Sequence, residues 1–481
     1  MKLRELLNGL TILSSSADLD ADIREVRYDS RAVETGDLFV AITGAETDGH
    51  KYIPMAREKG AACVVCQTVP EDGAPYVQVA DSRRALAVIG ANRFDHPADE
   101  LTMIGVTGTS GKTTSTYLIK SILEQKAGAR VGLIGTIQNM IGDRVLHTER
   151  TTPESYELQK LLREMADAGC SHVVMEASSH ALYLDRVYGI RYAVGVYTNL
   201  SRDHLDFHHT MEEYCDAKAI LFDNCDVGVY NADDPWHERL LQNARCPRRF
   251  SYAVHTQADL TAKNVQLHPG SVDFDAEADT EWAQVHVDTP ALFTVYNALD
   301  AMACCWNLGV PLAECADALA KSHGVKGRME IIPTPGKDYT ILNDYSHKPD
   351  ALENVLQSVK GFAKGRTVVL FGCGGDRDKT KRPVMGAIAA QLADFVIVTS
   401  DNPRTEKPEA IIADILEGMK DTATPYVTIP DRVEAIHYAM DHAQPGDVII
   451  LAGKGHEDYQ EINHKHYPMD ERVIVAAHLN K

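Results

Sequence analysis

The feature that most constrains the fold of this chain is a glycine-rich stretch at residues 105–114, Gly-Val-Thr-Gly-Thr-Ser-Gly-Lys-Thr-Thr. Residues 102–106 form a short apolar run that predicts a buried strand, and in residues 115–125 apolar side chains recur at helical spacing. A phosphate-binding loop requires this order of a strand, a glycine-rich turn ending in Lys-Thr, and a helix. The stretch therefore predicts a binding site for a nucleoside triphosphate.

The chemistry of such a loop comes from its backbone and from two side chains. Glycines allow backbone N–H groups to close around phosphate oxygens, and the following helix adds the positive end of its dipole. We expect Lys112 to reach the terminal phosphates and the Thr113 hydroxyl to ligate Mg²⁺. The residues expected to bind ATP here are Gly108, Thr109, Ser110, Gly111, Lys112, Thr113 and Thr114.

One departure from the usual loop pattern leaves an alternative. Val106 occupies the position at which the strict pattern G-x-x-x-x-G-K-[ST] has its first glycine. The alternative is an ordinary strand-to-helix turn with a solvated lysine. Gly-Lys-Thr-Thr at the start of a helix favours the nucleotide site.

The length and charge of the chain limit its organisation and partners. A chain of 481 residues is too long for a single core, and a typical domain size of about 150 residues suggests three domains. We expect them at residues 1–98, 99–325 and 326–481. The net charge of −21, from 48 basic and 69 acidic residues, argues against nucleic acid or an anionic membrane as a partner.

The N-terminus and the cysteines indicate a cytoplasmic protein. Lys2, Arg4 and Glu5 place charges where a signal peptide would have its apolar segment. No apolar run approaches the roughly 20 residues of a membrane span. Cys63 and Cys66 have C-x-x-C spacing, but they lie around a predicted buried strand and no second pair follows. Core cysteines are therefore favoured over zinc binding or redox chemistry.

Residues 1–98 predict a small α/β unit with short strands, in which Ser30 and Arg31 either hold a phosphate or cap a turn. Residues 99–325 alternate strand-like and helix-like segments, as in a doubly wound parallel sheet. Its predicted strands are residues 131–134, 172–175, 193–197 and 227–230. Ligands of open α/β sheets bind at the carboxyl ends of the strands, so the residues that follow each strand are candidates.

Two of these following residues are candidate Mg²⁺ ligands. Glu176 supplies a hard carboxylate oxygen after the second strand, and His204 follows the third. His204 is alternatively an ordinary polar loop residue. Residues 231–235, after the fourth strand, are equally a nucleotide contact or a simple turn.

Two further residues of the central part lie in predicted helices. By composition alone, Lys218 is a surface lysine of the helix at residues 211–222. Asn297 is expected to cap an apolar helix that starts at Tyr296. Neither position suggests chemistry by itself.

The last part of the chain predicts a second parallel sheet with one binding pocket. Strand-like runs at residues 339–342, 367–371, 395–398 and 447–451 are each followed by a polar loop. In a parallel sheet these loops share one edge, which suits a zwitterion with several carboxylates. Arg404 is the expected bidentate partner of a carboxylate, and Glu457 is placed to receive an ammonium. The alternative for each loop is a solvated turn.

Taken together, these stretches resemble the Mur ligase family over essentially the whole chain. The residues that carry the resemblance are 105–114, 151–154, 175–180, 198–208, 231–235, 327–328, 344–351, 374–382, 401–404 and 453–457. The resemblance implies a three-domain α/β architecture with an N-terminal domain for the UDP end of the substrate. It also implies a central P-loop ATPase domain and a C-terminal Rossmann-like domain that closes over the amino acid.

The resemblance also assigns site residues. It implies that Glu176 and His204 hold Mg²⁺ and that Lys218 is an N-carboxylated lysine beside the metal, which needs a neutral amine before it can react. Further ATP-binding residues are Asn297, Arg328 and His347. The implied residues for UDP-MurNAc-dipeptide are Tyr28, Ser30, Glu46, Thr47, Arg150, Thr151, Thr152, Ser178, Leu184 and Arg186. Those for the incoming amino acid are Arg377, Asp401, Asn402, Pro403, Arg404, Gly453 and Glu457.

The implied reaction is amide ligation in peptidoglycan precursor synthesis. ATP would phosphorylate the D-Glu γ-carboxylate of UDP-MurNAc-L-Ala-D-Glu, and the amine of the third amino acid would displace the phosphate. The Asp-Asn-Pro-Arg sequence at 401–404 resembles the version that takes meso-diaminopimelate, because an arginine pairs with its second carboxylate. We expect a monomer that needs Mg²⁺, with ATP as co-substrate.

Departures from the family pattern and rival activities remain. Arg150 stands where many relatives have Asn, Leu184 where Gln is often found, and Ser346 and Lys348 replace Ala and Thr of the commoner sequence. The first two bear on contacts to the muramoyl dipeptide, and the others on a detail near ATP. The alternatives are a lysine-adding Mur ligase, another Mur-like amide ligase, a nucleotide-gated binding protein and a kinase.

Overall fold

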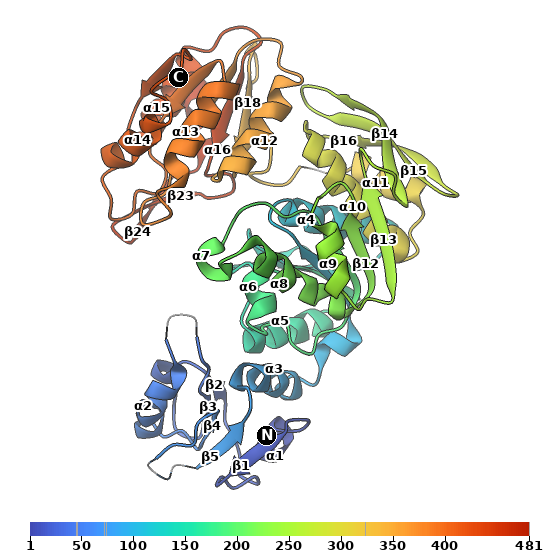
Figure 1. Cartoon of the computed structure of the whole chain (residues 1–481), viewed down its shortest axis with the longest axis vertical. Coiled ribbons are helices and arrows are strands. Elements are labelled where there is room, and N and C mark those ends of the chain that lie inside the picture. The colour runs from blue at the N-terminus through green and yellow to red at the C-terminus, as the bar shows by residue number, and fades with distance from the viewer. Residues whose placement is uncertain (45–46, 72, 74, 323, 481) are drawn as a thin grey trace. The chain divides into compact units, whose positions relative to one another are not determined.

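The computed structural model describes residues 1–44, 47–71, 73, 75–322 and 324–480. The chain divides into two compact units, Met1–Phe250 and Ser251–Lys481. Figure 1 shows the chain and labels many of its helices and strands. The α/β class predicted from the sequence is confirmed in both units.

The first unit begins with a sheet of order β1-β5-β4-β3-β2, in which β1 is antiparallel and the others are parallel. Apolar residues of α1 and α3 cover one face of this sheet. Ser30 and Arg31 lie in a short 3₁₀ helix whose start is capped by the Asp29 carboxylate. The elements are α1 (Leu3–Leu6), β1 (Ile12–Ser15), β2 (Val26–Arg27), η1 (Ser30–Ala32), β3 (Leu38–Val40), η2 (Gly49–Tyr52), α2 (Ile53–Glu58), β4 (Cys63–Cys66), β5 (Tyr76–Val79), α3 (Ser82–Arg93) and η3 (Pro97–Glu100).

The second sheet of this unit is doubly wound, with the order β12-β11-β6-β10-β7-β8-β9. Its first five strands are parallel, and β8 and β9 add an antiparallel hairpin. The elements are β6 (Thr102–Thr107), α4 (Lys112–Lys126), β7 (Val131–Ile134), β8 (Asn139–Ile141), β9 (Arg144–Leu146), α5 (Ser155–Asp167), β10 (His172–Glu176), α6 (Ser179–Tyr183), β11 (Tyr192–Tyr197), α7 (Leu205–His208), α8 (Met211–Asp223), β12 (Cys225–Asn231) and α9 (His237–Asn243).

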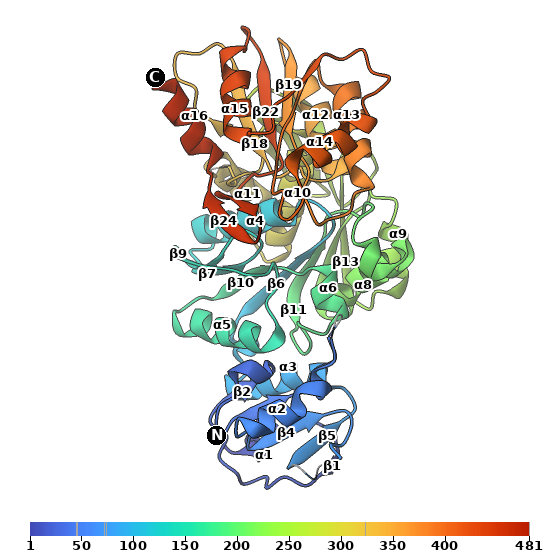
Figure 2. The same ribbon diagram turned by 90° about the vertical axis from the view of Figure 1, so that its left-hand side faces the viewer.

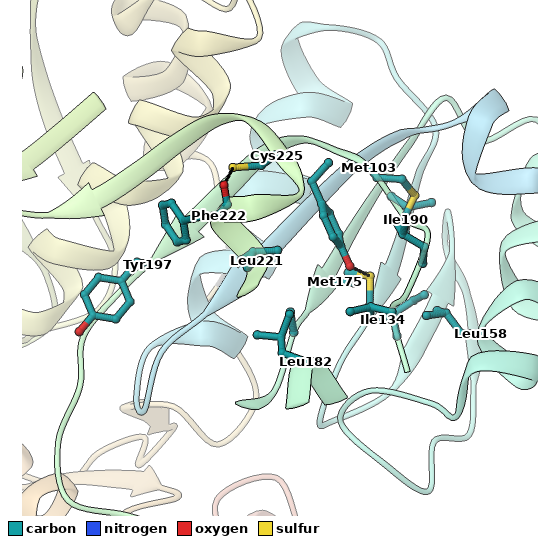
Figure 3. Close-up of a cluster of buried hydrophobic side chains, with 14 of the residues drawn as sticks. Met103, Ile134, Leu158, Met175, Leu182, Ile190, Tyr197, Leu221, Phe222 and Cys225 are labelled. Carbon is teal, nitrogen blue, oxygen red and sulfur yellow. Dashed lines mark hydrogen bonds between the residues drawn. The ribbon is translucent and has the colours of Figure 1, made fainter. Parts of the chain in front are cut away.

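Helices cover both faces of this sheet. Figure 2 shows α4 on one face and α5 on the other. The side chains of α5 and α8 share a core cluster with the sheet, and Figure 3 shows Met103, Met175 and Leu221 within it. The chain leaves β6 toward β7 and β10 on one side and later toward β11 and β12 on the other, so the strand order reverses beside β6. Such a reversal is where doubly wound sheets bind ligands.

The described strands of the second unit form three groups, of which the smallest is the two-stranded sheet of β23 and β24. The order β16-β15-β14-β13 is antiparallel except between β13 and β14, and α10 and α11 pack on it. The elements are β13 (Arg248–Ala253, which begins before the boundary), β14 (Leu260–Leu267), β15 (Val272–Ala278), β16 (Trp282–Val287), α10 (Leu292–Asn307) and α11 (Leu312–Ala320). The prediction that Asn297 caps a helix is wrong, because α10 begins five residues earlier after Pro290 and its apolar spacing is continuous from Leu292.

The remaining sheet has the order β17-β18-β22-β19-β20-β21 and is parallel except for β17, which gives the Rossmann-like arrangement that was predicted. Figure 2 shows α15 and α16 on one face and α12, α13 and α14 on the other. The elements are β17 (Glu330–Ile332), β18 (Thr340–Asp344), α12 (Pro349–Lys360), β19 (Thr367–Phe371), α13 (Lys381–Leu392), β20 (Phe395–Val398), α14 (Pro408–Glu417), β21 (Tyr426–Thr428), α15 (Arg432–Asp441), β22 (Val448–Ala452), β23 (Tyr459–Ile462), β24 (Lys465–Pro468) and α16 (Glu471–Leu479).

Two further observations bear on the sequence predictions. None of the ten cysteines forms a disulfide, all ten are buried, and Cys63 and Cys66 lie on β4 as core residues. Within the described part of the chain, no helix combines the length and apolar character needed to cross a membrane.

Candidate active site

The glycine-rich stretch forms a loop between β6 and α4, as predicted. Gly108 has φ +149° and Gly111, the N-cap of α4, has φ +88°, a backbone that side chains with a Cβ rarely adopt. A Cβ added to Gly108 would lie 1.9 Å from Oγ1 of Thr198. Glycine is therefore needed at position 108 because Thr198, just after β11, comes so close, as well as because of the backbone conformation.

The segment after β11 holds this loop in place. Thr109 N–H donates to the Asn199 carbonyl (2.9 Å), and Ser110 N–H donates to Oδ1 of Asn199 (3.0 Å). Thr198 Oγ1 donates to the Ser110 carbonyl at 2.6 Å. These bonds occupy two of the loop N–H groups that the sequence assigned to phosphate. They give Asn199 a structural role that the sequence did not indicate.

Two lysines converge on one carbonyl of the loop. Nζ of Lys112 lies 2.8 Å from the Gly108 oxygen, and Nζ of Lys218 lies 2.9 Å from the same oxygen. Lys218 is only 1% exposed and also faces the ring of Tyr214, so its interpretation as a surface lysine is wrong. The fold of α8 against the loop, rather than local composition, buries it. This places positive charge beside the predicted phosphate site.

Glu176 lies at the centre of a network of hydroxyl groups. It is 1% exposed, and its Oε1 accepts from Thr113 Oγ1 at 3.0 Å and from Thr136 N–H at 2.9 Å. Thr136 Oγ1 donates to Oε2 at 3.0 Å and lies 3.0 Å from Oγ1 of Thr151. A loop residue of the predicted triphosphate site and a residue assigned to the muramoyl dipeptide are therefore linked through one carboxylate. The sequence missed Thr136 in this role.

Two more of the residues assigned to the dipeptide, Thr152 and Ser178, lie at the carboxyl end of β10. Thr152 Oγ1 donates to the Glu176 carbonyl at 2.7 Å and lies 3.2 Å from Ser178 Oγ. Ser178 also caps α6, since its side chain accepts from the N–H of Ala181. Thr151, Thr152 and Ser178, which lie far apart from the loop in sequence, thus meet at the carboxyl end of β10.

His204 belongs to a cluster of rings beside this centre. It has φ +53°, pairs with Asp203 at 3.0 Å, and its ring centroid lies 4.8 Å from that of His180. Burial lowers the pKa of His180 to about 4 and that of His208 to about 4, so both are neutral at pH 7. Among the described residues, no group of three or more His, Cys, Asp or Glu is arranged to hold a metal ion.

The donor set nevertheless fits Mg²⁺. Mg²⁺ keeps several waters and usually takes one or two carboxylates together with substrate phosphates. The carboxylate of Glu176 and the hydroxyl of Thr113 are oxygen ligands within hydrogen-bonding distance of each other, next to the predicted phosphate site. A complete cage of protein ligands is not needed for this ion.

The acidic turn at residues 231–235 has a structural role. Tyr197 OH donates to Oδ1 of Asp234 at 2.7 Å, and Leu200 N–H donates to Oδ2 at 3.0 Å. Asn231 donates to the Thr198 carbonyl at 2.9 Å. The turn therefore supports the segment that in turn supports the glycine-rich loop.

A second region of this unit collects arginines around one carboxylate. Glu154 is buried, and its Oε2 lies 3.3 Å from Nε of Arg186, 3.5 Å from Nη1 of Arg83 and 4.0 Å from Nη1 of Arg150. Burial lowers the pKa of the Arg186 guanidinium. Arg83 also donates to the Leu184 carbonyl at 3.4 Å, which ties this backbone to the cluster. Three guanidinium groups against one carboxylate leave positive charge that suits an anionic ligand.

Three more of the residues assigned to the dipeptide substrate, Tyr28, Ser30 and Thr47, lie in the N-terminal part of the unit. Tyr28 OH donates to Oε2 of Glu157 at 2.9 Å, and Ser30 is buried with Oγ 3.4 Å from Sδ of Met55. Thr47 Oγ1 lies 3.4 Å from the hydroxyl of Tyr52. Glu46 lies outside the described residues. Arg83 and Glu154 are the contacts that sequence reasoning did not assign to the site.

In the second unit, the predicted amino-acid residues meet at the carboxyl ends of β20 and β22. Glu457 accepts from Nδ2 of Asn402 and from Nζ of Lys454, both at 2.9 Å, and from Tyr345 OH at 3.3 Å. Lys454 is fully buried and also donates to Oδ1 of Asn402 at 2.6 Å. Lys454, which the sequence did not single out, fixes both predicted contact residues.

Asp401 and Gly453 lie against each other in this pocket. A Cβ added to Gly453 would lie 2.6 Å from Oδ2 of Asp401, and that buried oxygen has no hydrogen-bond partner among the described residues. Pro403 leads into Arg404, whose Nε donates to Oε2 of Glu461 at 2.8 Å. Arg377 is exposed and donates to the Asp376 carbonyl at 3.1 Å.

Two of the residues assigned to ATP in this unit, Arg328 and His347, pack against the ring of Tyr345. The guanidinium of Arg328 lies 4.8 Å from the ring centre of Tyr345, and the rings of His347 and His456 lie 4.4 and 4.8 Å from Tyr345. Burial lowers the pKa of His347 to about 3. Asn297 lies elsewhere in the unit, 5% exposed within α10.

Comparison with known proteins supports a single family. The Mur ligase middle domain matches residues 106–305, the Mur ligase glutamate ligase domain matches residues 327–455, and the Mur ligase family catalytic domain matches residues 22–94. Together these three matches extend over most of the chain.

Three relatives that are similar to this chain over nearly its whole length are all named as the same ligase. A UDP-N-acetylmuramoyl-L-alanyl-D-glutamate–2,6-diaminopimelate ligase of Clostridium tetani is 46% identical over 482 residues, covering 99% of this chain and 98% of that protein. The ligase of the same name from Clostridium botulinum is 45% identical over 460 residues, 94% of each chain. A solved structure with that name has 33% identity and a TM-score of 0.73, covering 100% of this chain and 99% of its own.

More distant structures share the fold alone. The MurF ligase of Thermotoga maritima, solved in complex with ADP, has 20% identity and a TM-score of 0.63, covering 90% of this chain and 94% of its own. The folylpolyglutamate synthase of Mycobacterium tuberculosis has 17% identity and a TM-score of 0.64, covering 77% and 92%.

Proposed function

The chain belongs to the Mur ligase family, and from this premise we propose that it is an ATP-dependent, ADP-forming ligase that adds meso-diaminopimelate to UDP-MurNAc-L-Ala-D-Glu. The new amide would form at the γ-carboxylate of the D-Glu residue. The observation that carries the proposal is the network at Glu176, where Thr113 of the glycine-rich loop and the Thr136–Thr151 pair bond the same carboxylate. It supports a triphosphate and an acceptor acid bound next to each other.

In the first step the γ-carboxylate would attack the terminal phosphorus of ATP, which gives an acyl phosphate and ADP. Lys112 and the helix dipole of α4 would neutralise charge on the transferring phosphoryl group. In the second step the amine of the amino acid would attack the carbonyl carbon, and phosphate would leave from the tetrahedral intermediate. Neither step needs a nucleophilic side chain from the protein.

Mg²⁺ would be held by Thr113 and Glu176, with His204 and an N-carboxylated Lys218 as further partners, and would supply positive charge to the phosphate oxygens. Lys218 fits this role because its buried amine lies beside the loop. Reaction of that amine with CO₂ would turn it into a carboxylate-like ligand for Mg²⁺. Arg83, Arg150 and Arg186 would bind acidic groups of the nucleotide-sugar peptide. Tyr28, Ser30, Glu46, Thr47, Thr151, Thr152, Ser178 and Leu184 complete that proposed site.

The incoming amino acid would bind among residues 401–404, Gly453, Glu457 and Arg377. Glu457 would receive an ammonium, and Arg404 would pair with the carboxylate that diaminopimelate has and lysine lacks. Asn297, Arg328 and His347 would contribute to ATP binding. We further propose a monomer that works in the cytoplasm, where ATP and UDP-linked precursors are made; light scattering during gel filtration tests the monomer.

The decisive experiment is a phosphate-release assay with ATP, Mg²⁺ and UDP-MurNAc-L-Ala-D-Glu, in which meso-diaminopimelate, L-lysine and L-glutamate are compared as amine. We expect release with diaminopimelate and a product whose mass exceeds the dipeptide substrate by one diaminopimelate less one water. Preference for lysine would favour the lysine-adding alternative, and preference for glutamate a folylpolyglutamate-type ligase. A stable phosphorylated product that accumulates without consuming an amine would indicate a kinase.

The Arg404→Ala variant tests the proposed specificity contact. Removing a charge-assisted hydrogen bond, which costs about 1.5–3 kcal/mol, should raise the diaminopimelate KM by roughly 10- to 150-fold. The KM for ATP should not change. Lys420→Ala, at an exposed ion pair, serves as the control. An unchanged diaminopimelate KM would show that another residue binds the second carboxylate.

A further inference from the structure

Arg404 is held by a hairpin that the sequence did not identify. The hairpin consists of β23 and β24, and its Glu461 side chain accepts from Nε of Arg404 at 2.8 Å. The side chains of Arg404 and Glu461 are 16% and 19% exposed, so solvent competes little with this bond. An ion pair of this kind, in a proposed ligand pocket, has no part in the reaction chemistry described above.

The backbones of the two segments are fixed to each other as well. Arg404 has φ +50°, a conformation that costs a residue with a side chain about 1 kcal/mol or more. Its N–H donates to the Glu461 carbonyl at 3.1 Å, and its carbonyl accepts from Asn463 N–H at 2.9 Å. Glu461 N–H donates to Oδ1 of Asn402 at 2.8 Å. The hairpin thus stabilises a strained backbone at the position proposed to recognise a carboxylate.

The hydrogen bonds of the Arg404 guanidinium to the described residues use two of its five N–H donors. A guanidinium has five N–H donors. Nε donates to Glu461 and Nη1 donates to the Gly375 carbonyl at 2.8 Å, and these are its side-chain bonds to the described residues. The remaining donors are both hydrogens of Nη2 and one of Nη1. Gly374 lies beside that region, since a Cβ there would come within 3.0 Å of Nη1.

We propose that Glu461 is a positioning residue for substrate recognition: by binding Nε it directs the Nη1–Nη2 edge of Arg404 toward the distal carboxylate of the incoming amino acid. This inference rests on the proposed function, in which Arg404 binds that carboxylate. A carboxylate can approach a guanidinium across Nε and Nη2 or across Nη1 and Nη2. Glu461 occupies the first approach, so the second is left for the substrate.

The negative charge of Glu461 weakens substrate binding, whereas its positioning of Arg404 strengthens it. The test must separate these two effects. Its carboxylate repels the substrate carboxylate, so an alanine variant loses both the repulsion and the positioning. Glu461→Gln also removes the charge but keeps an oxygen that can accept from Nε. The ratio of the diaminopimelate KM values of Glu461→Ala and Glu461→Gln therefore measures positioning alone.

We expect this ratio to be about tenfold, equivalent to about 1.4 kcal/mol, because the alanine variant must order a long side chain when the substrate binds. The KM for ATP and for the dipeptide substrate should be equal in the two variants. In an Arg404→Ala background the two substitutions should become indistinguishable. Equal diaminopimelate KM values, or a tenfold ratio that persists without Arg404, would overturn the proposal.

Crystal structures of both variants without substrate provide a readout that does not depend on the reaction. Arg404 should keep its position in Glu461→Gln and lose it in Glu461→Ala. If wild-type protein ligates a different amine, the proposed function fails while this structural result still stands. An Arg404 side chain that is unmoved in the alanine variant would show that Glu461 does not position it.

Discussion

Replacing Gly108 by alanine tests whether the glycine-rich loop is built for its ligand. The new Cβ would lie 1.9 Å from Oγ1 and 3.1 Å from Cβ of Thr198, so Thr198 must move and lose its 2.6 Å bond to the Ser110 carbonyl. The φ of +149° adds a backbone penalty for any residue with a Cβ.

The backbone penalty and the lost hydrogen bond together set the expected loss of ATP affinity. The backbone penalty is about 1–3 kcal/mol and the lost hydrogen bond about 1 kcal/mol. If ATP binds only the present loop conformation, its apparent affinity falls by the population of that conformation. A total of about 2–4 kcal/mol corresponds to a loss of roughly 30- to 900-fold in affinity.

The assay is calorimetric titration of Mg-ATP into wild-type and Gly108→Ala protein, with urea unfolding measured in parallel. Gly128→Ala is the matched control, because Gly128 follows α4 with φ +62° and a Cβ added there would meet no atom of the described residues within 4 Å. That variant should lose stability but keep its ATP affinity. An affinity of Gly108→Ala within about threefold of wild type would refute the steric argument.

Three other predictions address the charges of the protein. Lys112→Ala should lower the rate of ATP-dependent phosphate release at least about 100-fold, since a cation near the phosphates is lost; retained turnover would remove Lys112 from the mechanism. Glu176→Gln should raise the Mg²⁺ concentration needed for half-maximal activity about tenfold, and an unchanged Mg²⁺ dependence would contradict its role as a ligand. The buried Arg382 lowers the pKa of Glu406 from 4.5 to about 2. Because the unfolded chain takes up this proton first, unfolding free energy should fall as pH drops from about 4.5 to 2, and Glu406→Gln should show a smaller fall in thermal melts.

The strands that could be predicted are those with continuous apolar runs. Residues 131–134, 367–371 and 395–398 coincide with β7, β19 and β20, because strands buried on both faces carry no polar interruption. The antiparallel strands β14 and β15 were missed. Along β15, buried and partly exposed residues alternate, so a search for period two could have found it.

The site residues likewise fall into those that the sequence could locate and those that it could not. Loops at strand ends could be located because the parallel sheet places them together, whereas partners from distant segments could not. Lys218 is buried because α8 packs against the glycine-rich loop, and no residue near it in sequence indicates this. Thr136, Lys454 and Glu461 were missed for the same reason, since each acts by binding a residue that lies 40, 52 or 57 positions away.

The burial of all ten thiols has a practical consequence for studying this enzyme. Thiol-directed dyes attach to exposed cysteines, so the native side chains should react slowly while the protein stays folded. A single cysteine introduced at Tyr467, an exposed position on β24, would then be labelled selectively. Fluorescence from that one site would follow, in real time, the hairpin that holds Arg404 as amino acids are added.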